Sequence, residues 1–122
     1  MRLLVVDDEP DFLNVLVEFF RDRGDEVSTA ENGRQAWAIY RESPDNFDAI
    51  LIDNRMPEMS GIDCIKQIRK NGFLVPIILA SGDWEADHDK AIIDEVFEIL
   101  SKPLKLATLD SVFSRLESSL TK

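Results

Sequence analysis

Side chains able to do chemistry follow four of the short apolar runs in this chain. They are Asp7 and Asp8 after residues 3–6, Asp53 after residues 49–52, Ser81 after residues 76–80 and Lys102 shortly after residues 97–100. Three carboxylates in one place repel one another and need a cation, and hard oxygen ligands with room for water suit Mg²⁺. A hydroxyl and an ammonium beside them would serve the oxygens of a phosphate-like group. The residue types therefore indicate a site for a divalent metal and a phosphoryl group, provided that the fold brings them together.

The apolar runs have the character of strands in one parallel sheet. Residues 3–6 and 49–52 are short runs rich in branched side chains, which is typical of strands buried on both faces. Further strands are predicted at residues 27–30, 76–80 and 97–100. Stretches with apolar residues at helical spacing alternate with them. Five alternations of strand and helix predict an α/β fold with right-handed crossovers and helices on both faces. The carboxyl ends of parallel strands share one rim, where ligands of open α/β sheets bind.

Local signals predict where several helices begin and end. Pro10 suits the first turn of a helix that Asp8 would cap. Asn32 followed by a glycine would open the second helix, and Ser60 would cap the third. Gly24 would end the first helix.

Composition narrows the class of protein. The length of 122 residues, 44% of them hydrophobic and 31% charged, predicts one soluble domain covering residues 1–122. The net charge of −10 argues against nucleic-acid binding by this chain alone. No signal peptide and no run long enough to span a membrane is found, and the single cysteine, Cys64, fits a reducing compartment, so we expect a cytoplasmic location. Neither Cys64 nor His88 stands at a strand end, which leaves a zinc site or a Cys-His nucleophile without support.

Taken in order, these motifs resemble the receiver domain of two-component response regulators over essentially the whole chain. Val5-Val6-Asp7-Asp8 resembles the acidic pair after the first strand, and Leu51-Ile52-Asp53 with Met56-Pro57 and Gly61 resembles the phosphoacceptor strand and its loop. Ser81 stands at the hydroxyl position, and Lys102-Pro103 resembles the closing Lys-Pro. The resemblance implies a single-domain, doubly wound, flavodoxin-like (βα)5 fold with five parallel strands in the order 2-1-3-4-5.

The resemblance also implies the chemistry at Asp53. This residue would take a phosphoryl group from a phosphohistidine on a histidine kinase or a histidine phosphotransfer protein. Asp8, Asp53 and the backbone carbonyl of Arg55 would bind Mg²⁺ directly, while Asp7 would act largely through metal-bound water. Positioning and charge neutralisation would do most of the catalytic work.

Two further residues would hold the phosphoryl group. By resemblance, Lys102 would contact one phosphoryl oxygen, and Ser81 would donate to another and shift toward it on phosphorylation. The Lys102–Pro103 peptide bond is often cis in the family. Considered alone, each of these residues more often has a structural role, as a helix cap, the first residue of a loop, a turn residue or a surface lysine. Their joint placement at strand ends favours a phosphoacceptor site.

The implied function is a phosphorylation-controlled interaction module, which catalyses only its own phosphorylation and dephosphorylation. One alternative is the receiver part of a longer regulator or hybrid kinase with its effector beyond Lys122. Another is a receiver-like binding module that works without phosphorylation. A Mg²⁺ phosphohydrolase would need a substrate pocket motif and a second catalytic acid, and neither is found. The downstream protein target is not indicated, and the expected state is a monomer or a phosphorylation-dependent homodimer.

The sequence departs from the family pattern on the face that the family uses for partner binding. Ile99 stands where an aromatic switch residue is usual, and Phe97 is the nearby aromatic on the same strand face. Glu95-Val96 replaces a small Gly-Ala pair, and bulky Trp84 follows close behind Ser81. We therefore expect standard catalytic residues beside an unusual output surface.

The lifetime of the phosphorylated state is predicted to depend on Arg55 and Asp83, which stand two residues after the phosphoacceptor and the hydroxyl. An ion pair between them would screen the acyl phosphate from water. Replacing both with small neutral residues is expected to speed dephosphorylation, measured as the decay of phosphorylated protein. An unchanged decay rate would mean two independent solvated side chains, which are worth little to each other.

Overall fold

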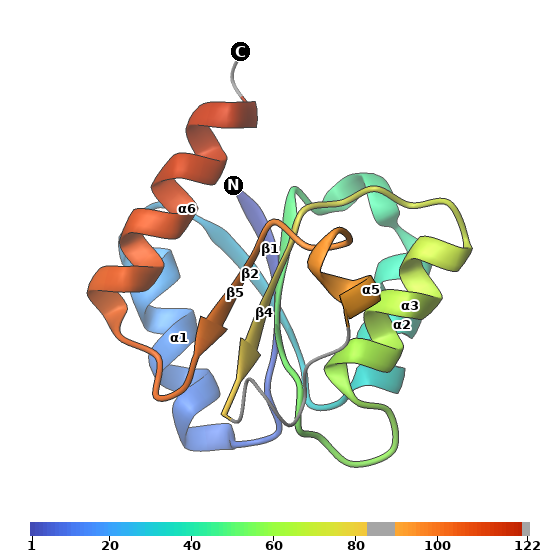
Figure 1. The fold of residues 1–122 in the computed structure, drawn as a ribbon. Coiled ribbons are helices and arrows are strands. Elements are labelled where there is room, and N and C mark those ends of the chain that lie inside the picture. Colours follow the sequence, from blue (N-terminus) through green and yellow to red (C-terminus); the bar gives the residue numbers. More distant parts are fainter. Residues whose placement is uncertain (83–89, 121–122) are drawn as a thin grey trace.

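Five parallel strands form the centre of the structure, and helices cover both of their faces (Figure 1). The strands are β1 Arg2–Val6, β2 Glu26–Ala30, β3 Ala49–Asp53, β4 Ile77–Ser81 and β5 Glu98–Ser101. They are ordered β2-β1-β3-β4-β5, with every neighbouring pair parallel. This computed structural model describes residues 1–82 and 90–120. It confirms the predicted α/β class, the strand order and the doubly wound arrangement.

The helices divide into two layers (Figure 1). Helices α1 (Pro10–Asp22) and α6 (Leu106–Leu120) lie on one face of the sheet. The other face carries α2 (Gly33–Glu42), α3 (Gly61–Lys70) and the short α5 (Lys90–Ile93), with a 3-10 turn, η1 (Pro44–Asn46), before β3. None of the helices in the described ranges is both long and apolar enough to cross a membrane.

Strand β1 shows why the central runs are apolar at every position. Leu4 and Val6 pack in the core beneath α2 and α3, whereas Leu3 and Val5 pack in the core beneath α1 and α6. Because successive side chains point to opposite faces, a strand covered on both sides must be apolar throughout. Cys64 lies in the first of these cores, fully buried, and burial raises the pKa of its thiol to about 12. Cys64 therefore packs there as a small apolar side chain.

The start of α1 differs from the prediction. Asp8 does not cap the helix: the N-cap residue is Glu9, which makes no side-chain capping hydrogen bond. The Glu9 N–H instead donates to the Asp7 carboxylate at 2.9 Å, and the Glu9 carbonyl accepts the N–H of Leu13. Asp8 is therefore left exposed and available to the rim of the sheet. Pro10 occupies the first turn as predicted.

The other two helix starts are as predicted. The side chain of Asn32 accepts the N–H of Gln35 at 2.7 Å at the start of α2. The Ser60 hydroxyl accepts the N–H of Asp63 at 3.1 Å at the start of α3. At the end of α1 the C-cap is Arg23, and Gly24 follows it at φ 96°, a conformation that favours glycine.

Strand β5 begins one residue later than predicted, at Glu98. Phe97 therefore lies before the strand, although its N–H still donates to the Ile77 carbonyl at 2.8 Å. The Arg115 guanidinium stands 5.9 Å from the centre of the Phe97 ring and forms an ion pair of 2.6 Å with Glu98. Ile99 is partly buried against the core beneath α2 and α3.

The unusual Glu95 is held by Arg69 at the end of α3. The guanidinium of Arg69 donates to the Glu95 carbonyl at 2.6 and 3.0 Å, and its Nε lies 3.3 Å from the Glu95 carboxylate. It also donates to the carbonyls of Phe73 and Val75, each at 2.8 Å. One planar donor group thus ties the segment before β5 to α3. The remaining departures, Asp83 and Trp84, and also His88, lie outside the described residues.

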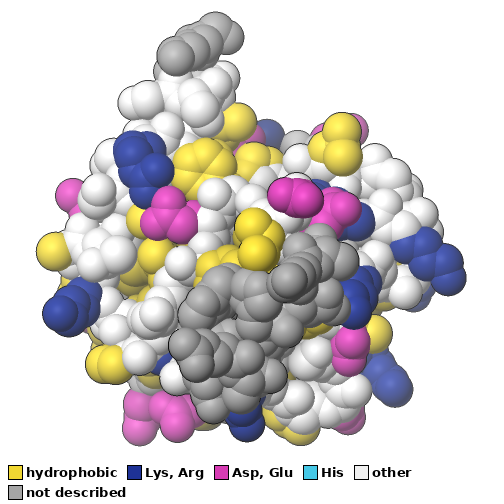
Figure 2. Space-filling view, in the orientation of Figure 1, with side chains coloured by type: hydrophobic (Ala, Val, Ile, Leu, Met, Phe, Trp, Pro, Cys, Tyr) yellow, Lys and Arg dark blue, Asp and Glu magenta, His cyan; other side chains and the backbone are white. Residues whose placement is uncertain are grey.

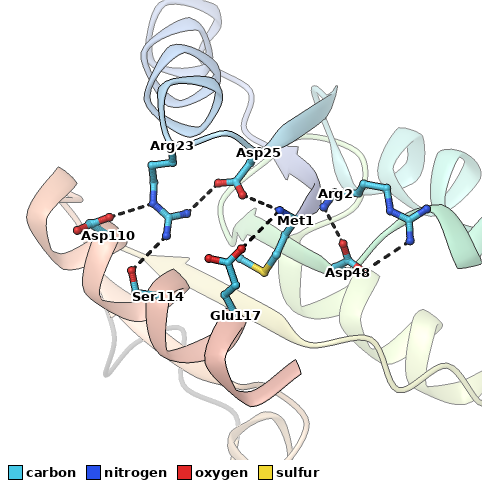
Figure 3. Close-up of polar contacts among 8 residues, drawn as sticks. All are labelled: Met1, Arg2, Arg23, Asp25, Asp48, Asp110, Ser114 and Glu117. Atoms are coloured by element: carbon cyan, nitrogen blue, oxygen red, sulfur yellow. Dashed lines mark hydrogen bonds and ion pairs between the residues drawn. The ribbon is translucent and has the colours of Figure 1, made fainter. Parts of the chain in front are cut away.

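A cluster of charges joins β1, the end of α1 and α6 at the amino end of the sheet (Figure 3). Asp25 is buried and accepts from the Met1 ammonium and from Arg23, both at 2.8 Å. Arg23 reaches on to α6, where it contacts Asp110 at 2.9 Å and Ser114 at 3.2 Å. Asp25 is therefore the shared partner of two cationic groups.

Removing the Asp25 carboxylate would leave both cations without their buried partner. Asp25→Ala is expected to lower the free energy of unfolding by about 3 kcal/mol, because breaking one side of a buried pair leaves uncompensated charge. The control is Asp110→Ala, which also removes a partner of Arg23. Because the Asp110 side chain is 60% exposed, this change should lower the free energy of unfolding by less than about 1 kcal/mol. Urea unfolding of both variants tests the contrast, and equal losses would contradict it.

Candidate functional site

Chemistry-bearing residues from four strands meet at the carboxyl rim of the sheet. Asp7 follows β1, Asp53 is the last residue of β3, Ser81 is the last residue of β4, and Lys102 follows β5. The sheet register pairs Asp53 with Ala80, so Ser81 extends one residue beyond it. All strands are parallel, which is why residues far apart in the sequence share this rim.

The three predicted acidic residues do come together. One carboxylate oxygen from each of Asp7, Asp8 and Asp53 lies within 4.8 Å of the others. Asp7 and Asp53 are buried, whereas Asp8 is exposed. The donor set consists of hard oxygen atoms with an open side toward solvent. Such a set fits Mg²⁺, which keeps several waters when protein carboxylates bind it.

Lys102 completes the cluster with positive charge. Its Nζ donates to Oδ1 of Asp53 at 3.1 Å. Partial burial works against the charged form of Lys102, but the hydrogen bond with Asp53 and the nearby carboxylates outweigh burial and raise the pKa of the ammonium. Lys102 is therefore a fixed cation beside the predicted phosphoacceptor.

Negative charge at the rim exceeds what Lys102 neutralises. Burial raises the pKa of Asp53, despite the opposing hydrogen bond from Lys102. Burial likewise raises the pKa of Asp7, despite the N–H that Glu9 donates to it. Among the described residues, the cluster of three carboxylates has one ammonium acting on it, that of Lys102. The imbalance favours binding of a further cation.

The loop after Asp53 is anchored by Asn54, a residue whose role the sequence analysis missed. Asn54 is buried, and its side-chain oxygen accepts the N–H of Ile62 at 3.0 Å. Its backbone carbonyl accepts the N–H of Gly61 at 2.9 Å, and its own N–H donates to the carbonyl of Ala80 at 2.9 Å. These bonds close residues 54–61 into a loop. The only signal in the sequence was a polar amide directly after a buried strand.

The remaining predicted site residues lie at the same rim. Ser81 is buried, and its backbone carbonyl accepts the N–H of Lys102 at 2.9 Å. The Lys102–Pro103 peptide bond is cis, as the resemblance suggested. Arg55 follows Asn54 in the closed loop and has an exposed side chain. The role of the Arg55 carbonyl as a metal ligand stays a prediction. The ion pair between Arg55 and Asp83 also stays a prediction, because Asp83 lies outside the described residues.

Comparison with known proteins identifies the family. Residues 3–114 match the family model described as "Response regulator receiver domain". The chain belongs to this family. A receiver domain protein from Clostridium thermocellum superposes with a TM-score of 0.87 at 27% identity, covering 99% of this chain and 98% of that one. TrrA of Thermotoga maritima, a response regulator in complex with Mg²⁺-BeF, superposes with a TM-score of 0.84 at 31% identity, covering 94% of this chain and 97% of that one.

Curated relatives carry a similar receiver domain within longer proteins. The regulatory protein AtoC of Escherichia coli is 33% identical over 93% of this chain, which is 24% of AtoC. A response regulator receiver protein of Anaeromyxobacter is 48% identical over 57% of this chain, which is 28% of that protein. The receiver domain described here thus matches about a quarter of the length of these relatives.

The raised pKa of Asp7 predicts a pH-dependent stability of the metal-free domain. The folded chain binds this proton more tightly than the unfolded chain, so the free energy of unfolding falls as pH rises through the raised pKa. Asparagine has no such proton and keeps an oxygen for the Glu9 N–H. In EDTA, Asp7→Asn is therefore expected to be more stable than the wild-type protein at about pH 7, with a smaller difference at about pH 3.

Urea unfolding at both pH values measures this difference. The control is Glu18→Gln, an exposed change on α1 that alters the net charge equally. A gain for Asp7→Asn no larger than that of the control would contradict the argument from burial.

Proposed function

We propose that this receiver domain accepts a phosphoryl group on Asp53 from a phosphohistidine of a histidine kinase or a histidine phosphotransfer protein, in a reaction that requires Mg²⁺. The observation that carries the proposal is the placement of Asp53 between Lys102 and two further carboxylates at one rim. The structural likeness to TrrA, which was solved with Mg²⁺-BeF, also supports it.

The residues present suit an in-line phosphoryl transfer. A carboxylate oxygen of Asp53 attacks phosphorus, the bond from phosphorus to the histidine nitrogen breaks, and that nitrogen keeps the electron pair. Lys102 neutralises a phosphoryl oxygen at the position where it now contacts Asp53. Asp7, Asp8, Asp53 and the Arg55 carbonyl would hold Mg²⁺, which would supply positive charge for the transferring group. Positioning and charge account for the catalysis.

The proposed output is a change in partner binding. Phosphorylation of Asp53 adds charge that Lys102 and Ser81 satisfy better in one arrangement of the rim loops, which shifts the population toward it. A hollow beside β5 is lined by residues 93, 96–99 and 101. Ile93 and Phe97 there are 46% and 38% exposed, and apolar atoms lie among charged ones on this face (Figure 2). Such a surface suits a protein partner.

The domain is proposed to act in the cytoplasm and to catalyse only its own phosphorylation and dephosphorylation. A second candidate is a receiver that controls an effector within a longer regulator. The small share of AtoC and of the Anaeromyxobacter protein that the chain matches favours this candidate. The chemistry at Asp53 would be the same in both cases.

Intact mass spectrometry after incubation with acetyl phosphate tests the proposal. The wild-type protein is expected to gain one phosphoryl group in Mg²⁺ and none in EDTA. Asp53→Asn should gain none, because the amide is not a nucleophile, whereas Asp63→Asn, an exposed change on α3, should behave like the wild type. Lys102→Ala should slow the gain by at least about tenfold.

Phosphorylation of Asp53→Asn to the wild-type extent would place the phosphoacceptor elsewhere. If the wild-type protein gains no mass, the same assay is repeated with a phosphorylated histidine phosphotransfer domain as donor. That assay tests whether Asp53 accepts a phosphoryl group only from phosphohistidine. Failure with both donors would leave a receiver-like fold that binds partners without phosphorylation.

A further inference from the structure

The first residue of α2 contacts the loop that follows the phosphoacceptor. Gly33 is buried, and its N–H donates to the carbonyl of Met59 at 3.1 Å. Met59 lies in the loop of residues 54–61, whose ends are tied together at Asn54 and Gly61. The loop is thus held at its ends by its own residues and at Met59 by α2.

The contact leaves no room for a side chain on Gly33. A Cβ built there would lie 2.9 Å from Cγ of Met59, 3.0 Å from its carbonyl carbon and closer still to its carbonyl oxygen. Two of these three atoms belong to the backbone, which cannot rotate away as the end of a side chain can. An alanine therefore forces α2 and the loop apart.

The loop is the part that would move. Helix α2 is held by the Asn32 cap and by the buried side chains of Ala36 and Tyr40. In the loop, by contrast, Pro57 and Glu58 are exposed, and Glu58 has a φ of 69°, which is uncommon for a residue other than glycine. A shift of residues 55–59 would displace the backbone beside Asp53 without touching any carboxylate of the site.

We propose that Gly33 is a positioning residue for phosphoryl transfer, which sets the loop after Asp53 by docking the start of α2 against the Met59 carbonyl. The inference rests on the proposed function, because it assigns the loop backbone a part in binding Mg²⁺. Groups that orient the ligands of a metal typically change its affinity when they are lost, even though they do not touch it.

Isothermal titration of Mg²⁺ and the rate of phosphorylation by acetyl phosphate test the proposal. Gly33→Ala is expected to weaken Mg²⁺ affinity about tenfold and to slow phosphorylation at subsaturating Mg²⁺. Gly82→Ala is the matched control, because a Cβ at Gly82 meets nothing within 4 Å. Val112→Ala, a core change on α6, controls for loss of stability alone. Both controls should bind Mg²⁺ like the wild type.

The outcomes separate this inference from the proposed function. If the wild-type protein binds Mg²⁺ and is phosphorylated, and folded Gly33→Ala matches it, the positioning role is wrong. The same holds if Val112→Ala loses as much Mg²⁺ affinity as Gly33→Ala. A wild-type protein that neither binds Mg²⁺ nor accepts phosphate overturns the proposed function instead.

Amide hydrogen exchange in the unsubstituted protein gives a second test that does not depend on any variant folding. If the loop and α2 are coupled, Mg²⁺ should slow exchange of the Gly33 N–H, although Gly33 is no ligand. The N–H of Ser43, which donates to the Tyr40 carbonyl at the other end of α2, should exchange at the same rate with and without Mg²⁺. Unchanged exchange at Gly33 under saturating Mg²⁺ would contradict the coupling.

Discussion

Repulsion among the carboxylates of Asp7, Asp8 and Asp53 is the constraint on which the rest of the site depends. A parallel sheet delivers all three to one rim, and burial of two of them makes their charge more costly. Lys102 offsets only part of this cost, as the raised pKa values of Asp7 and Asp53 indicate. The fold must therefore be stabilised elsewhere, chiefly by the two cores that cover both faces of the sheet.

The sequence predicted those features that follow from local chemistry. Strand β3 is apolar up to Asp53 because both of its faces are buried. The sequence therefore predicted where this strand ends. The caps at Asn32 and Ser60 follow from side chains that satisfy helix N–H groups. The strand order, by contrast, came from the family resemblance, because periodicity alone does not say which strands are neighbours.

Features that depend on tertiary contacts were missed or wrong. Asp8 looked like a helix cap, but Asp7 binds the Glu9 N–H and Asp8 turns to the site instead. Asn54 gave no pattern, since its partner, the N–H of Ile62, is part of a loop closed by the fold. Gly33 read as a helix start, and only the approach of Met59 shows why no side chain fits there. In each case the folded chain sets the contact, and the local sequence pattern does not specify it.

Buried negative charge is balanced by cations at the amino end of the sheet and is in excess at the carboxyl end. At the amino end, one buried carboxylate, Asp25, has two cationic partners, so this end is stabilised without any ligand. At the carboxyl end, three carboxylates share one ammonium among the described residues, that of Lys102, so a bound cation would relieve repulsion as it binds. A ligand that binds only the folded state stabilises it by mass action. Under the proposed function, the unbalanced rim would couple occupancy of the site to the stability of its loops, and a partner protein would detect a change in that occupancy through those loops.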